Sequence, residues 1–274
     1  MWRKAIIMGL CVMLVLTASC AKSQANISGG DSGTSSVVDT PSSSAETTIT
    51  TEMPFVTFTN TSAKYYIQSY TLTDTSHQGS TVIIRYPQLV SAGSDKVNGV
   101  IKTKATKIAS DYYGSDYANL SLDVDYHLTF NNDDWLSISF NGSGNVKTAA
   151  HPNDILQTMN INLKDGYEIK LTDIYNVNAD FVRVFRNEFS SQVKTRLAVI
   201  MGFSPADTDS AASYLDQYDD QTLTKYLSNS YCYMTNDKIG ISFEMPHAIG
   251  DHFETEIPYS DLLKDLKMKV APFQ

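Results

Sequence analysis

Alternation of apolar and polar residues in the middle of this chain constrains its fold more than any other feature. Apolar residues recur at every second position in four segments between residues 122 and 175. Such alternation is typical of a β-strand that has one face in a core and the other in water. The segments are 122–130, 136–140, 159–163 and 167–171. They predict two antiparallel hairpins, the second turning at Asp165 and Gly166, which tolerate the positive φ of a tight turn.

The rest of the folded part combines further strands with amphipathic helices. Apolar residues at helical spacing predict helices over 94–112, 180–197 and 209–228, the last broken near Tyr218, and a short helix after Pro258. Pro87 cannot donate a ladder hydrogen bond, so we expect it at a strand end or edge. Further strands are expected over 65–72, 81–89, 231–233, 239–243 and 253–257. This pattern predicts an α+β fold of antiparallel sheets with helices packed on one face.

The N-terminus has the features of an export signal. Arg3 and Lys4 precede an apolar run over 5–16, which is short for a membrane span but suits a secretory signal. Small residues then lead to Cys20, as in the bacterial lipobox, where the cysteine is acylated and becomes the new N-terminus. Thr17 stands where leucine is preferred, so an ordinary signal peptide is the alternative. We expect a signal peptide over 1–19, lipidation of Cys20 and a location on the extracytoplasmic face of the cell membrane.

The segment that follows Cys20 is dominated by serine, threonine, glycine and alanine. It lacks the apolar surface needed to offset chain entropy, so we expect a disordered tether over 20–60. The remainder is predicted to form two intimately associated α+β sub-domains, 61–150 and 151–274, with the boundary in the 147–154 loop.

Charge and cysteine content restrict the possible partners. The net charge is −9 and no basic stripe is present, which makes nucleic acid an unsuitable partner and favours a basic one. Of the three cysteines, Cys11 lies in the signal and Cys20 is the expected lipidation site. Cys232 is therefore the one cysteine of the folded part, and we expect it to be buried and unreactive.

Tyrosines are abundant, with 16 in the chain, and three of them lie close together in sequence. Tyr112, Tyr113 and Tyr117 fall where a predicted helix meets a predicted hairpin. Such a cluster could stack on sugar rings or anchor a protein partner. Packing at the core and its rim is the alternative interpretation.

His151 lies before Pro152 in the loop between the two hairpins and is a further candidate for ligand binding. A structural, hydrogen-bonded histidine is the alternative. Asp123 and Asp125 share one face of a strand, and with His151 they could supply acid and base groups to a cell-wall polysaccharide hydrolase or a deacetylase-associated enzyme. Solvated positions on a half-exposed strand give the same pattern.

No metal or cofactor is predicted. His247, Asp251 and His252 are possible zinc ligands, but Pro246 and Gly250 interrupt the helix that would place them on one face.

A series of short motifs runs through the folded part, from about residue 65 to 270. The motifs are Arg85-Tyr86-Pro87-Gln88, Tyr112-Tyr113, Asn119-Leu120, Val124-Asp125-Tyr126, Leu136-Ser137-Ile138-Ser139-Phe140, Ala150-His151-Pro152, Asn162-Leu163-Lys164-Asp165-Gly166, Leu171-Thr172-Asp173-Ile174 and Ile257-Pro258-Tyr259-Ser260-Asp261-Leu262. In order and spacing these motifs resemble the exported DUF4163 and DUF3298 domain pair of the anti-sigma-V factor and of the N-terminal region of some peptidoglycan deacetylases.

The resemblance implies a recognition module and not a reaction. In the anti-sigma factor this region binds lysozyme, and in the deacetylases it accompanies a separate catalytic domain. Signal, tether and resemblance together predict a membrane-anchored lipoprotein that acts as a non-catalytic sensor for peptidoglycan, another envelope ligand or a lysozyme-like protein.

Overall fold

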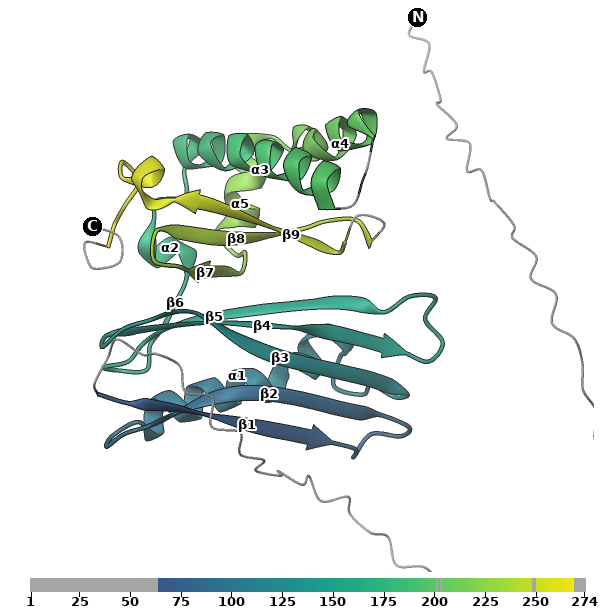
Figure 1. Cartoon of the computed structure of the whole chain (residues 1–274), viewed down its shortest axis with the longest axis vertical. Helices are drawn as coiled ribbons and strands as arrows, with labels where there is room; N and C mark the ends of the chain where they lie inside the picture. The colour runs from purple at the N-terminus through teal and green to yellow at the C-terminus, as the bar shows by residue number, and fades with distance from the viewer. Residues whose placement is uncertain (1–63, 201, 203, 248–249, 269–274) are drawn as a thin grey trace, which may run out of the picture. The chain divides into compact units, whose positions relative to one another are not determined.

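The structure is a computed structural model that describes residues 64–268, except 201, 203, 248 and 249. The expected signal peptide, Cys20 and the tether lie outside the described residues. The predicted α+β class is confirmed, because the described chain forms a six-stranded sheet and a three-stranded sheet together with helices (Figure 1).

The six-stranded sheet has its strands in sequence order. Its strands are β1(Tyr66–Asp74), β2(Thr81–Val90), β3(Leu120–Asn131), β4(Trp135–Val146), β5(Asn153–Asn162) and β6(Glu168–Ile169). The predicted hairpins β3–β4 and β5–β6 are both present and antiparallel. β6 is shorter than predicted, because Leu171 begins a helix in place of extending the strand. The Asp173 carboxylate accepts a hydrogen bond from the Lys170 N–H at 2.9 Å and so starts that helix.

One strand pair differs from the antiparallel prediction. β2 and β3 are parallel from Thr81↔Ser121 to Ile84↔Val124. Parallel neighbours need a long crossover, and helix α1(Asp95–Tyr113) supplies it.

Pro87 lies inside β2, opposite Ser69 of β1, and not at the end of a strand. The pairing of β2 with β3 stops at Ile84, so the side of β2 away from β1 is open at Pro87. Two residues further on, the N–H of Leu89 points to that open side and donates to the Asn98 side chain at 2.8 Å. Proline is therefore tolerated because its position has no ladder bond to lose, which agrees with the expected edge character.

α1 covers one face of the six-stranded sheet. The apolar residues of the alternating segments lie on that face. The buried residues of this core include Val97, Ile101, Ala105 and Ile108 of α1, Leu122 and Val124 of β3, Leu136, Ile138 and Phe140 of β4, and Met159 and Ile161 of β5. Strands β3 and β4 approach closely at Gly142, where an added Cβ would lie 2.1 Å from the Asp123 carbonyl oxygen.

The second half of the chain forms the three-stranded sheet and most of the helices. Its elements are α2(Leu171–Ile174), α3(Ala179–Ile200), α4(Pro205–Ala212), η1(Tyr214–Gln217), α5(Asp220–Leu227), β7(Cys232–Met234), β8(Lys238–Glu244), β9(His252–Pro258) and η3(Tyr259–Leu262). The predicted break near Tyr218 is confirmed, because Tyr218 is extended and Asp219 caps α5 by accepting a hydrogen bond from the Thr222 N–H at 2.7 Å.

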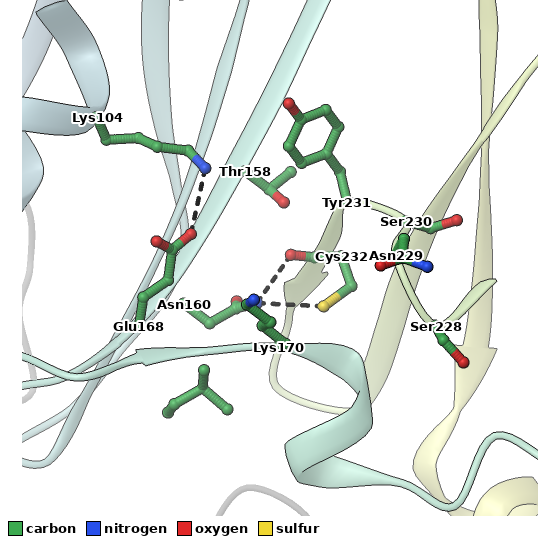
Figure 2. Close-up of a pocket in the computed structure, with 11 residues that line it drawn as sticks. Lys104, Thr158, Asn160, Glu168, Lys170, Ser228, Asn229, Ser230, Tyr231 and Cys232 are labelled. Atoms are coloured by element: carbon green, nitrogen blue, oxygen red, sulfur yellow. Dashed lines mark hydrogen bonds and ion pairs between the residues drawn. The ribbon is translucent and has the colours of Figure 1, made fainter. Parts of the chain in front are cut away.

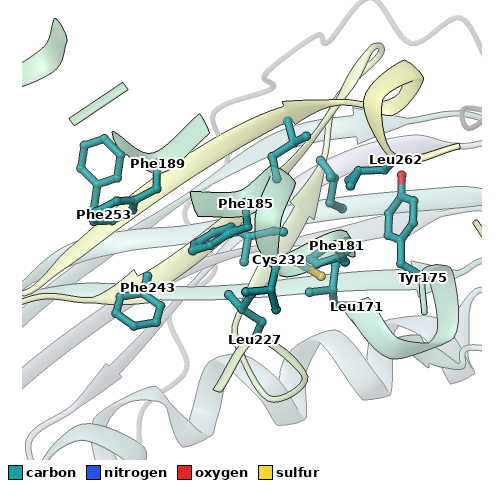
Figure 3. Close-up of a cluster of buried hydrophobic side chains, with 14 of the residues drawn as sticks. Leu171, Tyr175, Phe181, Phe185, Phe189, Leu227, Cys232, Phe243, Phe253 and Leu262 are labelled. Carbon is teal, nitrogen blue, oxygen red and sulfur yellow. The ribbon is translucent and has the colours of Figure 1, made fainter. Parts of the chain in front are cut away.

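Aromatic side chains fill the core between α3 and the three-stranded sheet (Figure 3). Phe185 of α3 lies 6.1 Å from Phe243 of β8, and Phe189 lies 5.4 Å edge-on from Phe253 of β9, measured between ring centroids. Edge-to-face contacts of this kind stabilise the packing beyond the area that they bury. α3 and the six-stranded sheet lie on opposite sides of β7–β9 (Figure 1).

Buried polar side chains join the two sheets. Ser137 of β4 donates to Asn160 of β5 at 2.7 Å, and the Asn160 amide donates to the Cys232 carbonyl of β7 at 2.8 Å. The Ser137 hydroxyl in turn accepts a hydrogen bond from the N–H of Met234 at 2.9 Å. The expected boundary at 147–154 falls inside the six-stranded sheet, since β5 pairs with β4 along its whole length; the change of sheet comes after Ile169.

Candidate functional site

Two adjoining hollows lie beside α1 and meet at Lys104 and Glu168. The larger one, which we call the α1 groove, is an open depression of about 610 Å³. The smaller one, the inner hollow, has about 150 Å³ and lies between β5, β6 and the segment that enters β7 (Figure 2). The α1 groove is defined by Asp95, Lys96, Thr103, Lys104, Lys107 and Asp111 of α1 with Met159 and Glu168.

One face of α1 forms a wall of the α1 groove. Lys96, Lys104, Lys107 and Asp111 recur at intervals of three, four or eight residues, which places them along one side of a helix. The opposite, buried side carries the apolar residues that fix α1 on the sheet. The amphipathic pattern of α1 therefore places charged side chains in the groove while it buries the other face.

Lys104 is the fixed charge where the two hollows meet. Its Nζ lies 3.2 Å from Oε1 of Glu168 and 5.4 Å from the centre of the Tyr231 ring (Figure 2). Its side chain is only 19% exposed, so the ion pair is partly shielded from solvent. A cation above an aromatic face is attracted by the electron density of the ring. Glu168 and Tyr231 thus hold the ammonium of Lys104 in one place.

Tyr231 presents an aromatic surface at this junction and is 38% exposed. Burial of its hydroxyl raises the pKa of Tyr231, and the neighbouring carboxylates Asp111, Glu168 and Glu244 raise it further. The Tyr231 side chain is therefore neutral, with carboxylates near its hydroxyl and the Lys104 ammonium over its ring. These three carboxylates belong to α1, β6 and β8, which are distant in sequence.

The Cys232 thiol at the back of the inner hollow is unreactive. Burial raises the pKa of the Cys232 thiol to about 12, which keeps the thiol protonated at neutral pH. The prediction that Cys232 is a buried, free cysteine is confirmed. Asn160 beside it is committed to the hydrogen bonds that join the sheets.

Tyr112 has a structural contact at the edge of the six-stranded sheet. Its hydroxyl donates to the Leu156 carbonyl at 2.6 Å and accepts from the Leu156 N–H at 2.9 Å. β6 pairs with β5 only at Asn160 and Ile161, so Leu156 lies beyond the end of β6. Burial raises the pKa of Tyr112 to about 12. Tyr112 thus takes the place of a strand neighbour at this position.

Tyr113 and Tyr117 lie away from the α1 groove. The ring of Tyr113 rests on Gly144, where an added Cβ would lie 2.2 Å from its hydroxyl oxygen. The Tyr117 ring stacks on His77 with centroids 3.9 Å apart, and its hydroxyl donates to Asp74 at 3.0 Å. These contacts are those of packing, the alternative interpretation of the tyrosine cluster.

His151 is exposed and lies at a meeting of two loops. Its ring centroid is 5.3 Å from that of His247, whose Nδ1 lies 2.7 Å from Asp251. Asp251 also accepts a hydrogen bond from the Asp154 N–H at 2.8 Å. Burial of Asp251 raises its pKa, but this hydrogen bond, the one from His247 and the electrostatic effect of His247 and His252 outweigh burial and leave the pKa lowered. The contacts tie the β4–β5 loop to the β8–β9 loop.

Two other sequence hypotheses concern chemistry. Within the described ranges, no group of three histidine, cysteine or carboxylate side chains could hold a metal ion. Asp123 pairs with Arg85 at 2.6 Å, and Asp125 accepts from the Tyr126 N–H at 2.8 Å. Among the residues that the structure describes, no hydrogen bond, ion pair or ring contact joins either aspartate to His151.

Sequence reasoning missed Lys104, Glu168 and Tyr231. The lysine spacing along α1 was available as a signal, since it places three positive charges on one helix face in an acidic chain. Glu168 and Tyr231 meet Lys104 only through the tertiary fold.

In the described part of the chain, no helix is both long and apolar enough to cross a membrane.

Two DUF3298 proteins are among the solved structures to which this chain is similar. A DUF3298 family member from Bacteroides fragilis is 15% identical, with a TM-score of 0.47, and the match covers 76% of this chain and 96% of that one. A DUF3298 family protein from Pseudomonas aeruginosa is 12% identical, with a TM-score of 0.45 and coverage of 73% and 94%. At these values the similarity assigns no role to any residue of this chain. No protein-family model and no curated protein matches the sequence.

Proposed function

We propose that this chain is a lipid-anchored, extracytoplasmic protein that binds a cell-envelope ligand and does not transform it. The N-terminal sequence supports the anchor, since an apolar signal and small residues lead to Cys20. A polar segment then separates Cys20 from the folded body and would hold that body away from the membrane.

The α1 groove is the observation that carries the binding role. It is an open depression of about 610 Å³, within the usual size range for ligand sites. Lys104 is held in place by Glu168 and Tyr231 where the α1 groove meets the inner hollow, so a ligand would meet a charge that is already oriented. Preorganised charges of this kind reduce the entropic cost of binding.

Peptidoglycan and a basic, lysozyme-like protein are the two candidate ligands. The net charge of −9 favours the second candidate, because an acidic surface accelerates association with a basic protein. The resemblance to a lysozyme-binding ectodomain points the same way.

Lipidation can be tested with a matched pair of cysteine variants in a bacterial host. We expect an alkyne-tagged fatty acid to label the full chain and Cys11→Ala but not Cys20→Ala, and only Cys20→Ala to leave the membrane fraction. Cys11 is the control because it lies in the apolar part of the signal. Equal labelling of Cys20→Ala and the unchanged chain would contradict the anchor.

Binding can be tested by retention of the full chain, purified in detergent, on insoluble peptidoglycan and on immobilised lysozyme. We expect retention on peptidoglycan that falls as salt is raised, because the groove charges are solvent-exposed. Failure to bind either material would reject both proposed ligands.

The hydrolase with His151 and Asp123 or Asp125 is the alternative function. Its test is the release of reducing sugar or acetate from peptidoglycan by the full chain and by His151→Gln. Turnover that disappears in the variant would replace the binding function with an enzymatic one.

A further inference from the structure

The lysines of the α1 groove lie between two aspartates. Lys96, Lys104 and Lys107 occupy most of the length of the α1 wall, with Asp95 beside Lys96 at one end and Asp111 at the other. Residues 96 to 111 span about 22 Å along a helix that rises 1.5 Å per residue. A ligand lying along α1 would therefore meet a run of positive charge that ends at the carboxylate of Asp111.

The Asp111 end is suited to a cation. Asp111 is exposed and accepts a hydrogen bond from the Gln157 amide at 3.0 Å, which orients its carboxylate. The Tyr231 ring already faces the Lys104 ammonium, so Asp111 attracts the ammonium group of a ligand by its charge.

The lysine end is suited to carboxylates. Lys104 is fixed by Glu168, whereas Lys107 is exposed on the same helix face. The side chain of Lys96 lies beside the β5–β6 turn, where a Cβ on Gly166 would be 3.3 Å from its Cγ. The turn therefore lies against the Lys96 side chain at this end of α1.

We propose that the α1 groove binds a short, extended peptide whose carboxylates face Lys96, Lys104 and Lys107 and whose ammonium faces Asp111. This inference rests on the proposed function and names its ligand class, since the peptides that cross-link cell walls carry both kinds of charge. A span of about 22 Å accommodates six or seven extended residues at about 3.3 Å each.

Other envelope polymers match the groove less well. A polyanion would meet Asp95, Asp111 and Glu168 as like charges. A neutral glycan would leave both sets of charges without partners. A zwitterionic peptide complements both ends at once, and complementary charge gives specificity more than affinity.

The test uses the full chain in detergent and the tetrapeptide alanyl-glutamyl-lysyl-alanine, with affinity measured by calorimetry. We expect Lys107→Gln and Asp111→Asn each to weaken binding about threefold, as is usual for a single exposed charge pair. Lys102→Gln and Asp116→Asn are matched controls, because both residues are exposed and lie outside the groove. The controls should bind as the unchanged chain does.

Acetylation of the peptide lysine tests the direction of binding. It should weaken binding to the unchanged chain about threefold but leave the affinity of Asp111→Asn unaltered, since the partner of the ammonium is already gone. Equal loss in both proteins would overturn the proposed orientation.

Competition on peptidoglycan separates this inference from the proposed function. If peptidoglycan retains the chain but the tetrapeptide does not compete, or Lys107→Gln is retained like Lys102→Gln, the peptide inference is wrong and the binding function stands. If peptidoglycan retains nothing, the proposed function itself fails.

Discussion

Asn160 is the residue whose loss should do most damage to the contact between the two sheets. Its side chain is 2% exposed, accepts from Ser137 at 2.7 Å and donates to the carbonyl and Sγ of Cys232 at 2.8 and 3.3 Å. Asn160→Ala removes these bonds and leaves the Ser137 hydroxyl and the Cys232 carbonyl with one buried partner fewer. At about 1 kcal/mol for each of the two bonds between oxygen and nitrogen or oxygen atoms, plus about 1–3 kcal/mol for a buried group that loses its partner, we expect a loss of about 3–5 kcal/mol.

Urea unfolding of the full chain in detergent, followed by circular dichroism, measures this loss. For a folded part of this size, the expected change lowers the midpoint of thermal unfolding by roughly 10 °C. Asn229→Ala is the control, because the Asn229 amide makes one exposed bond, to the Lys225 carbonyl at 2.8 Å, and its loss should change stability by less than about 0.5 kcal/mol.

A double variant tests whether the polar side chains act together. Ser137→Ala alone should also destabilise, since Ser137 accepts from the Met234 N–H and from Thr129. The combined loss should be smaller than the sum of the two single losses, because both residues share one hydrogen bond. A change below about 1 kcal/mol in Asn160→Ala, or strict additivity, would refute the argument that these bonds join the sheets.

Three further predictions concern single sites. In urea unfolding, Gly142→Ala should destabilise the protein by about 2–3 kcal/mol, because its Cβ would lie 2.1 Å from the Asp123 carbonyl oxygen. Gly99→Ala, whose Cβ would have nothing within 4 Å, should instead stabilise the protein by about 0.5–1 kcal/mol. Burial raises the pKa of Glu254, but His252 and Arg196 outweigh it and lower the pKa, so its contribution to stability is present above about pH 4.3 and is lost as the pH falls further. Unfolding at a series of pH values should show a weaker acid dependence in Glu254→Gln, and an unchanged dependence would contradict this. In a Cys20→Ala background, the Cys232 thiol should react with Ellman's reagent at pH 8 only after unfolding, and rapid reaction of the folded chain would contradict its burial.

The strands and helices could largely be predicted because each buries one face, which leaves a period in the sequence. Alternation over β3 and β4 predicted that Leu136, Ile138 and Phe140 share one side of the sheet, which is the side on which α1 packs. Interactions between distant segments leave no such period. The parallel pairing of β2 with β3 depends on where α1 returns the chain, and the inclusion of β5 in the first sheet depends on its pairing with β4.

The α1 groove was not predicted for the same reason. Its lysines lie on one helix, but Glu168 and Tyr231 come from segments about 60 and 130 residues away that only the fold brings to Lys104. The sequence drew attention to Tyr112, Tyr113 and Tyr117 because they are close in the chain. In the structure each makes its own contacts, with Leu156, Gly144 and Asp74 respectively.

The Tyr112 hydroxyl has a consequence for how molecules of this protein meet one another. It occupies both main-chain groups of Leu156 that face outward from β5, where a strand of a second molecule would otherwise begin to pair. The Tyr112 hydroxyl oxygen thereby prevents edge-to-edge pairing of the sheet with a second molecule at this position. Tyr112→Phe should leave the fold in place but make the protein prone to self-association as its concentration rises.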